Sequence, residues 1–160
     1  MKITKTTLDE LEIFEAESRV TLSYLIRKSE RYNFSRSTYY NGRFRDSYLK
    51  NEENSEVLDY TAISSQNGHY LIQTHNRKSQ CDGPITFTTT RMLFEEPVNV
   101  GSQIFSEYRG VYAYIRSPEP GIYHLKYPNG DSFTYKYKNG KLIEIETPQF
   151  IGKIRIVLEQ

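Results

Sequence analysis

GIYHLKYPNGDSFTYKYKNGKLIEIET, residues 121–147, is the stretch that decides the expected fold. Its apolar residues fall at odd positions and alternate with polar ones, a pattern typical of strands with one buried face. A three-residue loop at Pro128-Asn129-Gly130 pairs Leu125 with Phe133 and keeps the apolar residues on one face, whereas a two-residue loop mixes the faces. The stretch therefore predicts consecutive antiparallel strands in a defined register.

The same register argument extends to both sides of this loop. Tyr123 is expected to pair with Tyr135, and a second three-residue loop, Lys138-Asn139-Gly140, to pair Tyr135 with Ile143. The expected inward face carries Tyr123, Leu125, Tyr127, Phe133, Tyr135, Tyr137, Ile143 and Ile145. The expected solvated face carries His124, Lys126, Thr134, Lys136, Glu144 and Glu146.

Further turn signals precede this stretch. Asn-Gly pairs predict two earlier hairpins, 22–40 with 43–50 and 57–65 with 69–75. Residues 51–56, NEENSE, are expected to form a polar acidic loop between them. Residues 84–97 fit a strand and a short helix equally well. The alternating segment at 152–160, with Ile154, Ile156 and Leu158, is expected to end the sheet.

Composition agrees with a β domain that has a lean core. The 160 residues include 14 Tyr and 8 Phe but no Trp, and this length suits one core. We therefore predict a single all-β domain over residues 1–160. Its strands should form one curved antiparallel meander sheet or a partial β-barrel, with at most one short helix near 86–94.

Charge disfavours a dedicated nucleic-acid binder. Twenty-one Lys and Arg against 20 Asp and Glu leave a net charge of +1. A local basic patch with one aromatic ring is expected on the first hairpin, formed by Arg36, Tyr40, Arg43 and Arg45. Single-stranded nucleic acids bind such combinations, yet acidic residues at 52–59 compensate this patch. We expect no nucleic-acid partner.

Three sequence features bear on cellular location. No stretch approaches the length of an apolar membrane span, so no transmembrane segment is expected. Residues 1–15 lack the charged and apolar regions of a secretion signal. The lone Cys81 excludes an internal disulfide and a site built from several cysteines.

Metal and nucleophilic chemistry find little support. His69 and His75 lie on one expected strand, about 20 Å apart, and cannot share a metal ion. His124 belongs to another hairpin. No Gly-x-Ser-x-Gly elbow or Gly-rich phosphate loop occurs. We expect no metal, no cofactor and no catalytic residue of these kinds.

Carboxylates and arginines gather in the middle of the chain. Glu95, Glu96 and Glu107 could form a charge cluster with Arg91 and Arg109 that ties residues 85–97 to the next strand. Alternatively, two carboxylates facing one cleft could hydrolyse a glycan. The structural interpretation is the commoner one, so enzymatic activity is not expected but stays open.

The inward tyrosines carry the functional hypothesis. A buried Tyr hydroxyl needs a hydrogen-bond partner, so these rings fit either a structural core or the lining of a cavity. The leading hypothesis is a non-catalytic binding or envelope-associated module whose concave, tyrosine-lined face holds a lipid or another apolar or amphipathic ligand. The expected ligand-binding residues are Tyr123, Tyr127, Tyr135, Tyr137, Arg91, Glu107 and Arg109. A structural or partner-binding protein that forms a homodimer through an edge strand is a further alternative.

Several of these motifs also resemble those of a known family. They include Phe94 with Glu96-Pro97, Ser106-Glu107, Gly110, Pro128-Asn129-Gly130, and the run from Tyr135 to Gly140. Together they resemble an uncharacterised bacterial family of small, usually exported, β-rich proteins, a domain of unknown function. Residues 39–47 match it more loosely.

The resemblance implies a curved antiparallel sheet or partial barrel with no assigned activity. It also implies a periplasmic or exported protein. Relative to that family, we expect the chain to lack the N-terminal signal and the first strands. No catalytic residues are carried over from it.

Overall fold

Antiparallel β-strands form nearly all of the regular structure, as predicted. The computed structural model describes residues 1–24, 27–149 and 152–157. In chain order the elements are β1 (Lys2–Leu8), β2 (Leu11–Tyr24), β3 (Arg27–Tyr40), β4 (Arg43–Glu53), β5 (Glu56–Gln66), β6 (His69–Thr74), β7 (Lys78–Asp82), the 3-10 helix η1 (Arg91–Leu93), β8 (Gln103–Ser106), β9 (Val111–Glu119), β10 (Ile122–Lys126), β11 (Ser132–Lys138), β12 (Lys141–Gln149) and β13 (Gly152–Val157).

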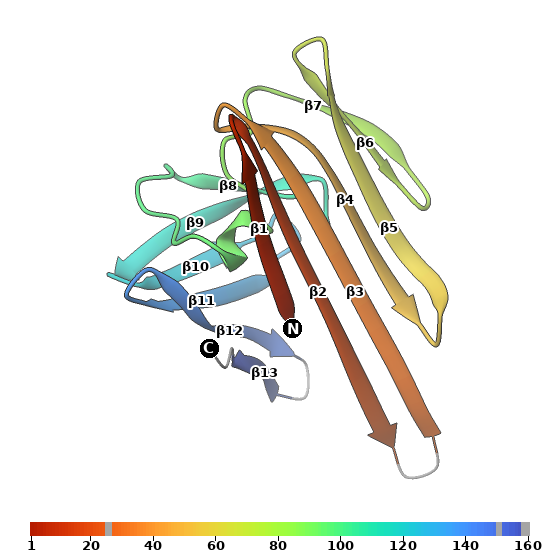
Figure 1. Ribbon diagram of the computed structural model, residues 1–160. Helices are drawn as coiled ribbons and strands as arrows, with labels where there is room; N and C mark the ends of the chain where they lie inside the picture. The colour runs from red at the N-terminus through yellow and green to blue at the C-terminus, as the bar shows by residue number, and fades with distance from the viewer. Residues whose placement is uncertain (25–26, 150–151, 158–160) are drawn as a thin grey trace. The chain divides into compact units, whose positions relative to one another are not determined.

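The strands form two open sheets and not the single sheet that was expected (Figure 1). The order is β1-β2-β3-β4-β5-β6-β7 in one and β13-β12-β11-β10-β9-β8 in the other. Residues 83–102 separate the two meanders. This segment has glycines with positive φ at Gly83 and Gly101, and prolines that cannot donate to a strand ladder.

Contacts divide the chain into two compact units. The first contains Met1–Thr86 and Glu107–Gly110, and the second contains Phe87–Ser106 and Val111–Gln160. The first sheet belongs to the first unit and the second sheet to the second. The expectation of a single domain over residues 1–160 stays a prediction.

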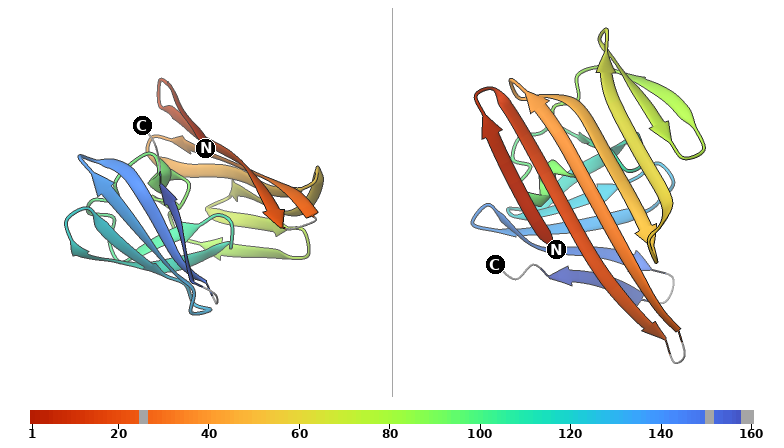
Figure 2. Two further views of the ribbon diagram at one scale, coloured as in Figure 1. Left: turned by 90° about the horizontal axis from the view of Figure 1, so that it is seen from below. Right: turned by 45° about the vertical axis from the view of Figure 1, so that its right-hand side comes forward.

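In the first sheet each strand pairs with the next one along the chain, and strands β1 to β5 lie side by side in Figure 2. The two predicted hairpins are confirmed as β3 with β4 and β5 with β6. The first begins at Arg27 and not at residue 22, because residues 22–24 belong to β2. Residues 25–26 lie outside the described residues.

The expected acidic loop at 51–56 is wrong. Asn54 and Ser55 both have positive φ, at 51° and 70°. They form a two-residue turn of the kind that joins hairpin strands, and Glu53 pairs with Glu56 across it. The remaining residues of this segment extend β4 and β5, so the hairpins continue into each other as one meander.

Register in the second sheet is confirmed at one turn and wrong at the next. Tyr123 pairs with Tyr135 as predicted, and Leu125 with Phe133. Tyr135, however, pairs with Ile145 and not with Ile143. Asn139 and Gly140 have positive φ and form a two-residue turn, and the β-bulge that follows it restores the alternation.

The bulge also changes which residues of β12 are buried. Leu142, which lies outside the predicted pattern, is buried, as is Glu144, which was expected on the solvated face. A hydrogen bond of 2.6 Å from Lys136 Nζ to a Glu144 carboxylate oxygen pairs this acid. Tyr123, Leu125, Tyr127, Tyr135 and Tyr137 are buried as predicted, and the partly buried Phe133 and Ile145 pack against them. Ile143 lies at the bulge and is only partly buried.

The 84–97 segment forms a short helix, one of the two alternatives. Its helical part is the three-residue 3-10 helix η1, with Met92 fully buried. Just before it, Thr88 forms an isolated parallel bridge with Phe105 of β8. At the other edge of this sheet lies β13, so the final strand does end the sheet; Leu158 lies outside the described residues.

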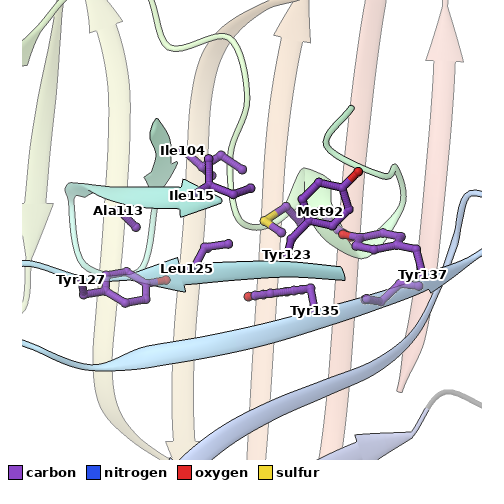
Figure 3. Packing of buried hydrophobic residues seen from close by; sticks show 10 residues of the cluster. Met92, Ile104, Ala113, Ile115, Tyr123, Leu125, Tyr127, Tyr135 and Tyr137 are labelled. Atoms are coloured by element: carbon purple, nitrogen blue, oxygen red, sulfur yellow. The ribbon is translucent and has the colours of Figure 1, made fainter. Parts of the chain in front are cut away.

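Each unit has its own buried apolar residues. In the first unit, aromatic rings of Phe14, Tyr39, Phe44 and Tyr70 follow one another at centroid distances of 5.5, 5.6 and 5.5 Å. In the second unit, the tyrosines of β10 and β11 gather with Met92, Ile104 and Ile115 (Figure 3). The second cluster contains the residues on which the functional hypothesis rests.

Close packing at Gly121 gives a test of the second unit. Gly121 has a φ of +80°, and an added Cβ would lie 2.8 Å from the backbone oxygen of Tyr137. We expect Gly121→Ala to lower the free energy of unfolding by about 2 to 4 kcal/mol through backbone strain and this clash. Gly130→Ala, with a similar φ but open space around it, should cost about 1 to 2 kcal/mol. Urea denaturation of both variants measures the difference, and equal losses would contradict this packing.

Candidate functional site

Four inward tyrosines form a buried layer. Tyr123 lies on β10, Tyr127 directly follows β10, and Tyr135 and Tyr137 lie on β11. Tyr123, Tyr127, Tyr135 and Tyr137 each expose only 6 or 7% of their surface. The Tyr137 hydroxyl donates a 2.6 Å hydrogen bond to the backbone carbonyl of Met92 in η1. The Tyr123 hydroxyl donates a 2.9 Å bond to Glu96 Oε1. The segment at 92–96 thus satisfies two buried hydroxyls that a purely apolar core would leave unpaired.

Their surroundings keep these two hydroxyls protonated. Burial raises the pKa of Tyr123 to about 12, and the hydrogen bond and negative charge of Glu96 add to the effect. Burial likewise raises the pKa of Tyr137, with smaller contributions from Tyr135 and Glu96. Both therefore act as hydrogen-bond donors throughout the neutral range, and neither suits a general base.

A hollow of about 270 Å³ opens next to this layer. It is lined by Pro97, Val98, Asn99, Val100, Gly101, Ile115, Arg116, Ser117 and Tyr123. Among the lining residues, Val98 exposes 59% of its surface, while Ile115 and Tyr123 are buried. Apolar side chains and one arginine therefore meet at the point where the tyrosine layer reaches solvent.

The remaining expected ligand-binding residues fall in two places. Arg91, in the second unit, has its Nε 2.8 Å from Glu95 Oε2 and its guanidinium over the Phe87 ring. Glu107 and Arg109 belong to the first unit. Glu107 is fully buried and accepts a 2.7 Å hydrogen bond from Ser37 Oγ.

These positions bear on the predicted charge cluster. The pair of Arg91 and Glu95 is present, whereas Glu96 bonds to Tyr123 and Glu107 to Ser37. A single cluster of all five residues stays a prediction. Sequence reasoning missed the role of Ser37, because a serine 70 positions away leaves no signal near Glu107.

Histidines and the cysteine take ordinary structural positions. His69 Nδ1 lies 2.6 Å from Asp82 Oδ1, which lowers the pKa of that carboxyl. His124 Nδ1 lies 2.9 Å from Thr134 Oγ1. Burial raises the pKa of the Cys81 thiol, which disfavours the reactive thiolate. Within residues 1–24, 27–149 and 152–157, no group of three metal-ligating side chains converges.

Two further hollows lie on the first unit. The larger, about 540 Å³, is lined by Arg19, Tyr32, Lys50 and Glu52 among others. Its positive charges are compensated, because Glu30 and Glu52 also line it and Lys50 lies 2.6 Å from Glu52. The other, about 340 Å³, includes Tyr40, Arg43 and Arg45 of the expected basic patch. Arg36 of that patch is directed to Glu15 instead, at 3.7 Å.

The Tyr137 hydrogen bond can be tested directly. Tyr137→Phe leaves the Met92 carbonyl without its donor, and we expect a loss of about 1 to 2 kcal/mol in the free energy of unfolding. Tyr114→Phe is the matched control, because Tyr114 exposes 59% of its surface, and it should change stability by less than about 0.5 kcal/mol. Chemical denaturation compares the two, and a neutral Tyr137→Phe would refute a structural role for this hydroxyl.

Comparison with known proteins gives one match. The family described as "Domain of unknown function (DUF6134)" matches residues 1–159. Neither the curated proteins nor the solved structures gave a match. Among the described residues, no helix has the length and apolar character needed to cross a membrane.

Proposed function

Because the chain belongs to the DUF6134 family of unknown function, its role has to be inferred from its own residues, and we propose that it is a non-catalytic binding module for an apolar or amphipathic ligand. The observation that carries this proposal is the hollow beside Tyr123. We further propose, from the resemblance of its motifs, that the protein acts in the periplasm or outside the cell.

The walls of the hollow suit a ligand with an apolar body. Val98, Val100 and Ile115 line it, and the exposed Val98 side chain would gain from being covered. A volume of about 270 Å³ is near the lower limit of small-molecule pockets, so a short chain or one small ring fits better than a large lipid.

Arg116 gives the hollow its amphipathic character. Its guanidinium is the cationic group among the lining residues, and guanidinium groups bind carboxylates strongly. Glu96 already accepts a hydrogen bond from the Tyr123 hydroxyl, so this acid is engaged with the tyrosine layer. A short fatty carboxylate, with its chain on the valines and its head near Arg116, matches both features.

The tyrosine layer supports this site without forming its whole surface. Tyr123 lines the hollow, and Tyr127, Tyr135 and Tyr137 pack behind it in the core. Arg91 fixes the preceding loop through Glu95. In this proposal these residues hold the pocket in shape, and the ligand contacts mainly Val98, Val100 and Tyr123.

The other functions considered from the sequence have less support. A glycan hydrolase needs two carboxylates that the substrate can reach, but Glu107 has no exposed surface. Strand addition at β1 would join two copies, yet Lys5 of this edge strand lies over the buried Phe14 ring and 2.9 Å from Glu12. Lys5 is exposed, and a charged lysine on an edge strand opposes such pairing.

Octanoate is a suitable probe for this site. We expect it to shift the methyl NMR resonances of Val98, Val100 and Ile115 in a saturable way. Val98→Asp should weaken its binding by about tenfold or more, because apolar contact is lost and a like charge is introduced. Val57→Asp is the control: Val57 is similarly exposed but lies on β5, and it should leave affinity unchanged.

Two results would contradict the proposal. Octanoate could leave these three methyl resonances unmoved, or it could bind Val98→Asp and Val57→Asp equally well. Native mass spectrometry of the protein from its own host is the complementary measurement, since a co-purifying small apolar acid is expected on the wild type and not on Val98→Asp.

A further inference from the structure

We propose that the first unit has a separate binding site, at the turn between β3 and β4, for a small oxyanion carried on a flat apolar group, such as an aryl phosphate or carboxylate. The site is the hollow of about 340 Å³. It is lined by Tyr40, Arg43, Phe44, Arg45, Ser65, Gly68, Tyr70, Gly83 and Pro84. All of these residues belong to the first unit, so the inference is independent of the site beside Tyr123.

The charge of this hollow is uncompensated. Arg43 and Arg45 both line it, and no acidic residue does. In the described part of the chain neither arginine forms an ion pair, whereas Arg31, Arg36 and Arg91 lie within 3.8, 3.7 and 2.8 Å of carboxylates. Two arginines that line one hollow without an acidic residue beside them suit the binding of an anion.

Local backbone geometry accounts for this pair of arginines. Asn41 and Gly42, with φ of 51° and 70°, form a two-residue turn, and Tyr40 pairs with Arg43 across it. A β-bulge follows, and Arg45 is its extra residue, because Phe44 pairs with Tyr39 and Asp46 with Thr38. Bulges redirect side chains, and both Arg43 and Arg45 are exposed here.

Two fixed aromatic rings, those of Phe44 and Tyr70, line the same hollow as the arginines. Phe44 and Tyr70 are buried, with ring centroids 5.5 Å apart. The Tyr70 hydroxyl donates a 3.1 Å hydrogen bond to the Phe44 carbonyl and accepts one of 3.4 Å from the Ile85 amide. A hydrogen bond of 3.2 Å from the Phe44 amide to the Ile85 carbonyl closes this arrangement. Binding here would therefore need little reordering of the Phe44 and Tyr70 rings.

The exposed ring of Tyr40 indicates the second half of the ligand. Tyr40 exposes 44% of its surface, and the Arg45 guanidinium lies 5.8 Å from its ring centroid. A flat group could stack against Tyr40 while its anionic end accepts hydrogen bonds from Arg43 and Arg45. The volume of the hollow suits a small molecule of this class better than a polymer.

Phenyl phosphate is the probe, with inorganic phosphate and phenol as its two halves. Isothermal titration at low salt should rank affinity as phenyl phosphate, then phosphate, then phenol. Arg43→Gln and Arg45→Gln should each weaken the binding of phenyl phosphate by about tenfold or more. Tyr40→Ala should weaken the binding of phenyl phosphate but leave the affinity for phosphate nearly unchanged, which separates stacking from charge.

Controls separate this site from the other and from loss of fold. Arg77→Gln, at an exposed arginine of the same unit that does not line this hollow, should bind phenyl phosphate as the wild type does. The octanoate site lies in the second unit, so failure there leaves this test intact. Arg43→Gln, Arg45→Gln and Tyr40→Ala should each keep the wild-type melting temperature within about 2 °C.

Three outcomes would overturn the proposal. Phenyl phosphate could bind the Arg43→Gln/Arg45→Gln double variant as tightly as the wild type. Phosphate alone could bind as well as phenyl phosphate, which would leave Tyr40 without a role. A single-stranded oligothymidine could bind far more tightly than phenyl phosphate and lose affinity steeply with salt, which would indicate a nucleic-acid surface instead.

Discussion

The second unit depends on one constraint, which is that a buried tyrosine hydroxyl must have a hydrogen-bond partner. Tyrosines stand where a drier core would have leucine or phenylalanine, and leaving such a hydroxyl unpaired costs roughly 1 to 3 kcal/mol. The loop around η1 supplies partners through the Met92 carbonyl and the Glu96 carboxylate. It must therefore lie against β10 and β11, and this position forms the hollow between residues 97–101 and Tyr123.

Polar groups that pair with one another are poor anchors for a ligand, and those that remain available mark the candidate sites. Lys50 and Glu52 neutralise each other in the hollow of about 540 Å³. Arg116 beside apolar walls, and Arg43 with Arg45 beside Tyr40, line the two smaller ones. The proposed functions thus rest on the residues that line these two hollows, among them Tyr123 of the tyrosine layer.

Sequence reasoning recovered the all-β fold and the register of β10 with β11, because alternation and a Pro-Asn-Gly turn left one consistent pairing. It misassigned β11 with β12, because the bulge at Ile143 depends on packing and has no local signal. It read the inward tyrosines correctly but could not choose between core and cavity. That choice depends on Glu96 and Met92, which lie 27 and 45 residues from their tyrosine partners. The division into two sheets was also missed, because turn signals look alike within a sheet and between sheets.

The most direct test of the paired-tyrosine account is an alkaline titration of ring-labelled tyrosines by NMR. An unfolded tyrosine ionises near pH 10, so a folded pKa of about 12 for Tyr123 means stability that is complete below pH 10 and falls as the pH rises toward 12. We predict that Tyr123 ionises about two units above an unfolded tyrosine and that Tyr137 ionises only when the protein unfolds. If Tyr123 and Tyr137 both ionised near pH 10 in the folded protein, the account would be contradicted.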